Sequence, residues 1–75
     1  MKLPARVESK SGVMMGKSCI KGTRIPIYLI LQKMAGGETA DQLLTAYPQL
    51  TKEDLQACLE YAAAIATEEV ILAEA

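Results

Sequence analysis

The chain has 75 residues, enough for one domain, and a chain of this size buries only about 60% of the surface that its unfolded form exposes. Its apolar fraction of 51%, with only three aromatic residues, fits a helical protein rich in Leu, Ile and Ala and excludes a disordered tail or a β-sandwich. No apolar run approaches the roughly 18 residues that span a bilayer. Lys2 is not followed by the apolar segment that a signal peptide carries. We therefore expect a cytoplasmic protein without membrane contact.

The charge is divided unevenly along the chain. The net charge is -1, but residues 1–33 carry +6 and residues 34–75 carry −7. Such a division favours two faces with different partners, or head-to-tail attraction within an oligomer, and the alternative is a merely soluble surface with uneven charge. Because an isolated core of this size is marginal, we expect a homodimer or a protein partner.

The N-terminal third is predicted to form a short hairpin or an extended arm. Its β-compatible stretches are residues 5–8 and 22–25, and turn signals lie between them at residues 11–12 and 16–17. Pro26 then has the φ angle of a first helical turn. Apolar residues follow at helical spacing, namely Ile27, Ile30, Leu31 and Met34.

The end of this first helix and the bounds of the second are also marked. Gly36 and Gly37 can take the left-handed conformation that closes a helix. Thr39 and Gln42 have the spacing of a capping box, which predicts a second helix over residues 40–47. Pro48 follows this helix and stops it, because proline disfavours helical geometry in the residue before it.

The third helix has the most specific start in the chain. Thr51 and Asp54 make a capping box, and Leu50 is placed to pack on Leu55 as a hydrophobic staple. A broad apolar face follows in two neighbouring stripes, over a helix of about 20 residues. The first stripe is Leu55, Leu59, Ala62 and Ala66, and the second is Cys58, Tyr61, Ile65 and Leu72.

The apolar character of the third helix continues past the length that a monomer of this size can easily cover. We therefore expect its far end to be a dimer or partner surface, and simple fraying of the chain end is the alternative. The residues of this predicted surface are Tyr61, Ile65, Val70, Ile71 and Leu72.

These elements predict a mainly α protein with one domain over residues 1–75. A β arm (residues 1–25) precedes a helix-turn-helix bundle (residues 26–75) that ends in a long helix. The second helix, a short turn and the third helix form the helix-turn-helix, supported by the first helix. Any three-helix bundle would have the same pattern of helix lengths and turns.

Catalytic, metal and cofactor chemistry find no support in the residues. The chain has no histidine, so it has no Ser/His or Cys/His pair, and its carboxylates lie at helix caps and solvated faces. Gly16-Lys17-Ser18 resembles the end of a phosphate-binding loop, but the leading glycine would have to be residue 11, which is Ser11. Cys19 and Cys58 fit buried, reduced side chains. We expect no enzyme, no bound metal and no cofactor.

If the chain binds nucleic acid, the basic arm is a better candidate for the contact than the third helix. The exposed start of that helix offers Lys52, Glu53, Gln56 and Glu60, a poor set for reading a major groove. The cations of the arm could contact phosphates or an acidic protein, and plain solubility is the alternative. These candidates are Arg6, Lys10, Lys17, Lys21 and Arg24.

One segment also carries a family resemblance. The stretch Gly16-Lys17-Ser18-Cys19-Ile20-Lys21-Gly22-Thr23-Arg24-Ile25-Pro26-Ile27 is similar to the signature of the prokaryotic family known as domain of unknown function 433, and similarity continues at residues 35–37, 47–51 and 61–63. Ser18 stands where the family usually has proline, which affects the rigidity of a turn. The resemblance implies a homeodomain-like helix-turn-helix fold preceded by short strands. In this segment we expect Gly22 to adopt an unusual backbone angle and Pro26 to begin the first helix.

The resemblance also implies a function. Members are similar to antitoxins, often encoded beside a PIN-like ribonuclease toxin that holds an acidic metal site. The leading hypothesis is an antitoxin-like protein that silences such a toxin through its basic arm or its apolar last helix, and that also binds operator DNA as a dimer. Lys17, Lys21 and Arg24 are the candidate side chains for insertion into the acidic site. The alternatives are a transcriptional regulator without a toxin partner and a module that only dimerises.

Overall fold

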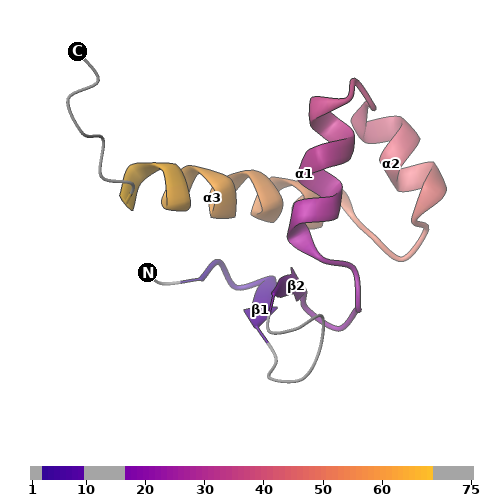
Figure 1. Ribbon diagram of the computed structural model, residues 1–75. Helices are drawn as coiled ribbons and strands as arrows, with labels where there is room; N and C mark the ends of the chain where they lie inside the picture. Colours follow the sequence, from indigo (N-terminus) through magenta and orange to yellow (C-terminus); the bar gives the residue numbers. More distant parts are fainter. Residues whose placement is uncertain (1–2, 10–16, 69–75) are drawn as a thin grey trace, which may run out of the picture.

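A computed structural model describes residues 3–9 and 17–68 of the chain. The described part holds a small antiparallel sheet and three helices, of which the last is the longest (Figure 1). The strands are β1 (Val7–Ser9) and β2 (Ser18–Ile20). The helices are α1 (Ile27–Ala35), α2 (Ala40–Ala46) and α3 (Lys52–Glu68). The prediction of a mainly helical protein with a short N-terminal hairpin and a long C-terminal helix is confirmed.

The second strand lies earlier in the chain than the sequence predicted. Strand β2 pairs with β1 in the register Val7 to Ile20, whereas the chain turns at residues 21–23 and forms no strand at residues 22–25. The reason is local hydrogen bonding: the Thr23 hydroxyl donates to the carbonyl of Ile20 at 2.8 Å and accepts from the amide of Ile25 at 3.0 Å. Gly22 sits in this turn at φ 81, as expected for the unusual angle predicted there. Turn chemistry therefore outweighs the β propensity of Thr23 and Ile25.

Helix α1 begins and ends where the sequence predicted. Pro26 precedes it with an extended backbone, φ -74 and ψ 144, and forms an isolated bridge to Cys19 of β2. At the other end Gly37 has φ 100, its amide donates to Met34 and the next amide donates to the carbonyl of Lys33. This pair of bonds is a Schellman motif, which satisfies carbonyl groups that the helix would otherwise leave unpaired.

Both predicted capping boxes are present. At α2 the amide of Thr39 donates to the Gln42 side chain at 2.8 Å, and the amide of Gln42 donates to the Thr39 hydroxyl at 3.2 Å. At α3 the amide of Thr51 donates to Oδ2 of Asp54 at 2.9 Å, and the amide of Asp54 donates to the Thr51 hydroxyl at 3.2 Å. The side chains thus fix both helix starts by bonding to amides that lack a partner within the helix.

The hairpin and the three helices share one core. Val7, Ile20 and Ile25 from the N-terminal segment belong to the same buried cluster as Ile30 of α1 and Leu43 of α2. Helix α3 contributes Leu55, Ala57 and Cys58 to this cluster, all from its first half.

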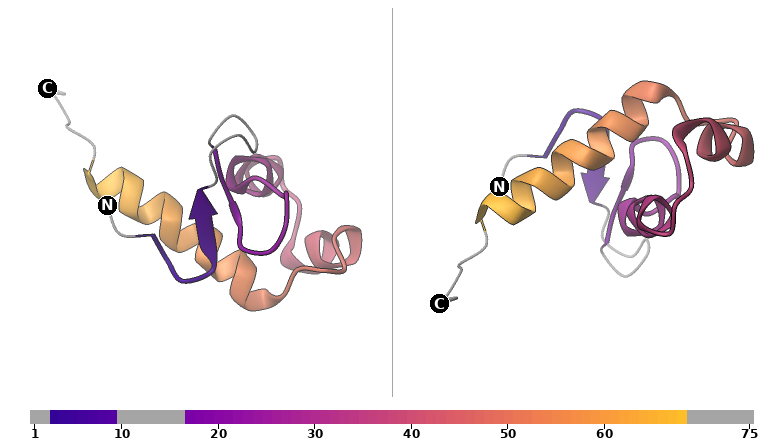
Figure 2. Two further views of the ribbon diagram at one scale, coloured as in Figure 1. Left: turned by 90° about the horizontal axis from the view of Figure 1, so that it is seen from below. Right: turned by 90° about the horizontal axis from the view of Figure 1, so that it is seen from above.

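The second half of α3 extends beyond the rest of the molecule. Figures 1 and 2 show α1, α2 and the hairpin gathered around the start of α3, while its later turns project away from α1 and α2. Leu59 is 49% exposed, so the predicted stripe of Leu55, Leu59, Ala62 and Ala66 is buried only at its first residue. The later turns of α3 therefore leave part of the predicted apolar stripe, Leu59 and Ala66, exposed in the described structure.

Candidate partner-binding surfaces

The four predicted basic contacts that the structure describes do not form one surface. Lys10 lies outside the described residues, and the other four fall into three environments. Arg6 places Nη1 3.2 Å from Oδ1 of Asp54, a carboxylate that is 6% exposed and also caps α3. This ion pair ties the chain before β1 to the start of α3. Arg6 therefore stabilises the fold through this contact, although half of its side chain remains exposed.

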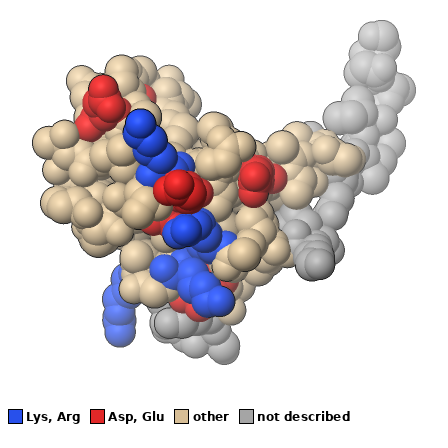
Figure 3. Space-filling model, turned by 180° about the vertical axis from the view of Figure 1, so that it is seen from behind, with Lys and Arg blue, Asp and Glu red and all other residues tan. Residues whose placement is uncertain are grey.

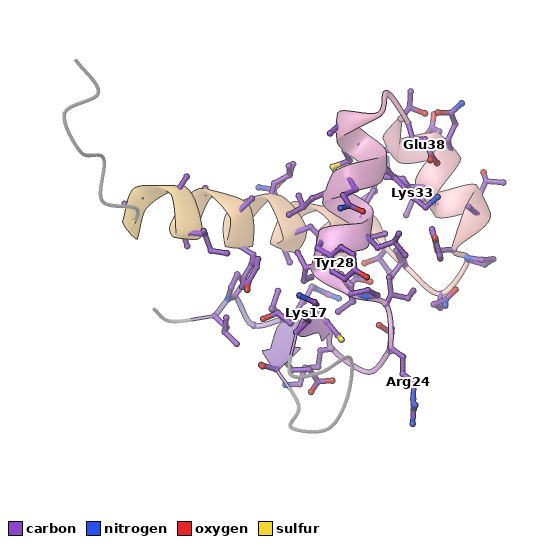
Figure 4. The ribbon with its side chains drawn as sticks, viewed as in Figure 1. Lys17, Arg24, Tyr28, Lys33 and Glu38 are labelled. Atoms are coloured by element: carbon purple, nitrogen blue, oxygen red, sulfur yellow. The ribbon has the colours of Figure 1, made fainter. Side chains whose placement is uncertain are left out.

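Lys17 stands at the edge of an apolar groove. Its Nζ lies 5.5 Å from the centre of the Tyr28 ring, within the range of a cation–π interaction. Figure 4 shows the two labelled side chains next to each other, at the junction of the hairpin with α1.

Lys21 and Arg24 occupy the tight turn after β2, and both are exposed. Neither side chain makes an ion pair or hydrogen bond with another described residue. Figure 4 shows Arg24 pointing away from the body of the protein. The turn itself is held by the Thr23 hydroxyl and by Glu8, whose carboxylate accepts a hydrogen bond from the amide of Gly22 at 3.0 Å. We call residues 21–24 the cationic turn.

The groove beside Lys17 lies between the hairpin, α1 and α3 and encloses about 320 Å³. One polar contact crosses it: the Ser18 hydroxyl donates to the Tyr61 hydroxyl at 3.1 Å. Tyr28 is 44% exposed and Ile65 is 42% exposed, so apolar side chains are open to solvent there. We call this the α1–α3 groove, and its lining residues are Lys17, Ser18, Ile27, Tyr28, Leu31, Tyr61 and Ile65.

The apolar stripe of α3 that faces the core continues into this groove, and its residues become less buried toward the end of the helix. Cys58 is fully buried, Tyr61 is half-buried and Ile65 is exposed, although the three residues follow one another at helical spacing. Of the residues predicted as a partner surface, the structure thus leaves Tyr61 half-buried and Ile65 exposed. The remaining members of that predicted surface, Val70, Ile71 and Leu72, lie outside the described residues.

The start of α3, together with α2, offers little to nucleic acid. Lys52 is the only exposed cation among the described residues of α2 and α3. The same two helices expose the carboxylates of Asp41, Glu53 and Glu60. On the face opposite that of Figure 1, Lys and Arg side chains interleave with Asp and Glu side chains instead of forming a patch of one sign (Figure 3). Lys33, a cation that the sequence analysis did not single out, pairs with Glu38 at 3.5 Å. An interleaved surface does not favour phosphate contacts.

The described residues hold no group of three or more His, Cys, Asp or Glu side chains that could bind a metal ion. Both cysteines are buried free thiols, as predicted. Burial, with a smaller contribution from the charge of Asp54, raises the pKa of the Cys58 thiol from 9.0 to about 11. Such a thiol stays protonated at neutral pH and is a poor nucleophile. No helix in the described ranges is long and apolar enough to cross a membrane.

The sequence analysis did not identify Tyr28 and Leu31 as surface residues, although both line the α1–α3 groove. Tyr28 directly follows the first core residue of α1, and Leu31 belongs to the apolar stripe predicted for this helix but is only half-buried. An exposed aromatic beside a helical core stripe was the available signal for Tyr28.

One protein family, one curated protein and one solved structure are similar to this chain. The profile of the family described as "Protein of unknown function (DUF433)" matches residues 7–62. An uncharacterized protein of Sinorhizobium fredii, y4eO, is 31% identical over 58 residues, which cover 77% of this chain and 26% of that protein. The crystal structure of a DUF433 member protein from Anabaena variabilis superposes with a TM-score of 0.79 at 32% identity, covering 84% of this chain and 62% of the other. The chain thus spans about a quarter of the first relative and less than two thirds of the second.

Proposed function

Because this chain belongs to the DUF433 family, whose function is unknown, we propose that it is an antitoxin-like binding protein that neutralises a PIN-like ribonuclease in the cytoplasm and is not itself an enzyme. The observation that carries the proposal is the cationic turn, where Lys21 and Arg24 are exposed and unpaired among the described residues. Two buried free thiols fit a reducing compartment.

The cationic turn suits an acidic partner because its backbone is already fixed. Thr23 bonds to the backbone on both of its sides, and Glu8 holds the amide of Gly22. A turn that is ordered before binding loses less conformational entropy in the complex than a flexible arm does. The guanidinium of Arg24 can donate two parallel hydrogen bonds to one carboxylate, and the ammonium of Lys21 adds a second positive charge.

Insertion of these two side chains into the acidic metal site of a ribonuclease would block it in two ways. The cations would compete with the divalent metal for its carboxylate ligands, and the turn would occupy the space of the RNA backbone. Opposite charges would also accelerate the encounter of the two proteins, and that acceleration weakens at high salt.

The test is a neutralisation assay in which this chain is co-expressed with a PIN-like ribonuclease toxin. The double variant Lys21→Ala and Arg24→Ala should lose growth rescue and bind the purified toxin at least about 30-fold more weakly, an effect of about 2 kcal/mol. Lys52→Ala is the matched control, because it removes an exposed cation from the start of α3, outside the cationic turn. Full rescue by the double variant would exclude the cationic turn as the inhibitory element.

A second proposal is operator binding through a homeodomain-like helix-turn-helix. It is supported by the short connection between α2 and α3, residues 47–51, with α1 packed against α3. The charges at the start of α3 count against direct reading of a major groove, as argued above. A mobility-shift assay over a salt series decides: operator DNA bound at low salt and released steeply with rising salt would favour this role, and no shift at low salt would reject it.

A further inference from the structure

We propose that residues 17–28 bind single-stranded nucleic acid, with a base stacked on Tyr28 and phosphates held by Lys17, Lys21 and Arg24. The proposal goes beyond the antitoxin-like function, because it needs no ribonuclease and depends on Tyr28, which lies outside the cationic turn. It also differs from operator binding, which concerns duplex DNA and the start of α3.

Residues 17–28 fold back on themselves at the cationic turn. Cys19 of β2 forms an isolated bridge to Pro26, and the amide of Ile20 donates to the carbonyl of Ile25 at 3.0 Å. The chain before the turn therefore runs antiparallel to the chain after it, and the same register continues on either side of these two contacts.

This register groups the proposed contacts into two pairs. Lys17 lies opposite Tyr28, in agreement with the 5.5 Å between its Nζ and the centre of the ring, and Lys21 lies opposite Arg24 across the turn. All of these side chains are exposed, whereas the residues between the two pairs are mostly buried. At the rise of an extended chain the pairs are about 13 Å apart, a span that a few nucleotides cover.

Tyr28 is suited to stack on an unpaired base. Its side chain is 44% exposed in the first turn of α1, directly after the buried Ile27, so the ring is open to solvent on a fixed backbone. An aromatic ring stacks on any base, and a cation beside it adds to the interaction. Because Lys17 already lies over the ring, this pair offers a stacking surface and a positive charge at one place (Figure 4). A duplex presents only base edges in its grooves, so stacking on Tyr28 favours a single strand.

The cations of this segment are available to phosphates. Lys17, Lys21 and Arg24 form no ion pair with another described residue. Glu8 approaches the turn from β1 and accepts a hydrogen bond from the amide of Gly22. No described residue that lines the groove beside Lys17 is acidic. Exposed cations next to an exposed aromatic ring are the combination that binds single strands without reading their sequence.

Fluorescence anisotropy with a labelled oligothymidylate of about 12 nucleotides tests the stacking contact. The wild-type protein should bind at low salt, and Tyr28→Ala should raise the dissociation constant at least about fivefold, as expected for the loss of one stacked base. Tyr28→Phe keeps the ring and should bind like the wild type. Leu59→Ala is the matched control, because it shortens an apolar side chain that is 49% exposed on α3 and should have no effect. Circular dichroism verifies that each variant keeps its helices.

A salt series tests the phosphate contacts. Lys17→Ala, Lys21→Ala and Arg24→Ala should each lower the slope of log affinity against log salt by about 0.7, the value for one phosphate contact with a single strand. Lys52→Ala removes an exposed cation at the start of α3 and should leave the slope unchanged.

An oligouridylate of the same length is the RNA probe. Binding of either strand supports the proposal, and the tighter one identifies the preferred sugar. Absence of binding to both strands at low salt would overturn the proposal, and so would wild-type affinity in Tyr28→Ala. Equally tight binding of the oligothymidylate after annealing to oligoadenylate would also overturn it, because the bases are then paired. The assay contains no ribonuclease, so its failure and that of the antitoxin-like function are distinguishable.

Discussion

The contact between Arg6 and Asp54 allows a quantitative prediction about folding. Asp54→Ala removes the acceptor of the Thr51 amide, the carboxylate at the first turn of α3 and the ion pair with Arg6. We expect about 1 kcal/mol for the cap, about 0.5 kcal/mol for the helix dipole and about 0.5 kcal/mol for the ion pair, which is small because Arg6 is half-exposed. The total of about 2 kcal/mol is a large fraction of the stability of a small domain.

A double-mutant cycle measures the share of the ion pair. Urea unfolding followed by circular dichroism should give a loss of about 2 kcal/mol for Asp54→Ala, with a coupling energy of about 0.5 kcal/mol between Arg6→Ala and Asp54→Ala. Glu53→Ala is the control, since it removes an exposed carboxylate from the same turn and should cost less than about 0.5 kcal/mol. A loss for Asp54→Ala no larger than that of the control would refute the reasoning.

Three further predictions concern the core and the helix ends. The raised pKa of Cys58 means that its contribution to stability is complete below pH 9 and is lost as the pH rises toward about 11; urea unfolding of Cys58→Ala across this range should show a weaker alkaline decline than the wild type. Gly37→Ala should destabilise by about 1 kcal/mol because a side chain is strained at φ 100, while Gly36→Ala, with φ -81, should be neutral or slightly stabilising in the same thermal melts. Leu43→Ala removes a fully buried side chain of α2 and should cost about 3 kcal/mol, and a measured loss below about 1 kcal/mol would show that this position is not part of a packed core.

The fold was most predictable where the signal is local hydrogen bonding. The capping boxes at Thr39 and Thr51 and the left-handed Gly37 each depend on a few neighbouring residues, and all three were predicted from sequence. The second strand was misplaced because the β propensity of residues 22–25 was weighed without the hydrogen bonds of the Thr23 hydroxyl, which make a turn there.

The candidate surfaces were less predictable because they depend on contacts between distant residues. The sequence identified Arg6 and Lys21 as equivalent cations, yet Arg6 meets a carboxylate 48 residues away and Lys21 meets none in the described structure. Likewise Lys17 and Tyr61 were assigned to different candidate surfaces, and the structure places both at one groove. Only the packing of α3 against α1 and the hairpin brings them together.

The proposed function is tested most directly by titrating a purified PIN-like ribonuclease with this protein while its cleavage of RNA is measured. We predict stoichiometric loss of ribonuclease activity with the wild-type protein and with Lys52→Ala, and little loss with the double variant at Lys21 and Arg24. Full ribonuclease activity in the presence of excess wild-type protein would contradict the antitoxin-like function.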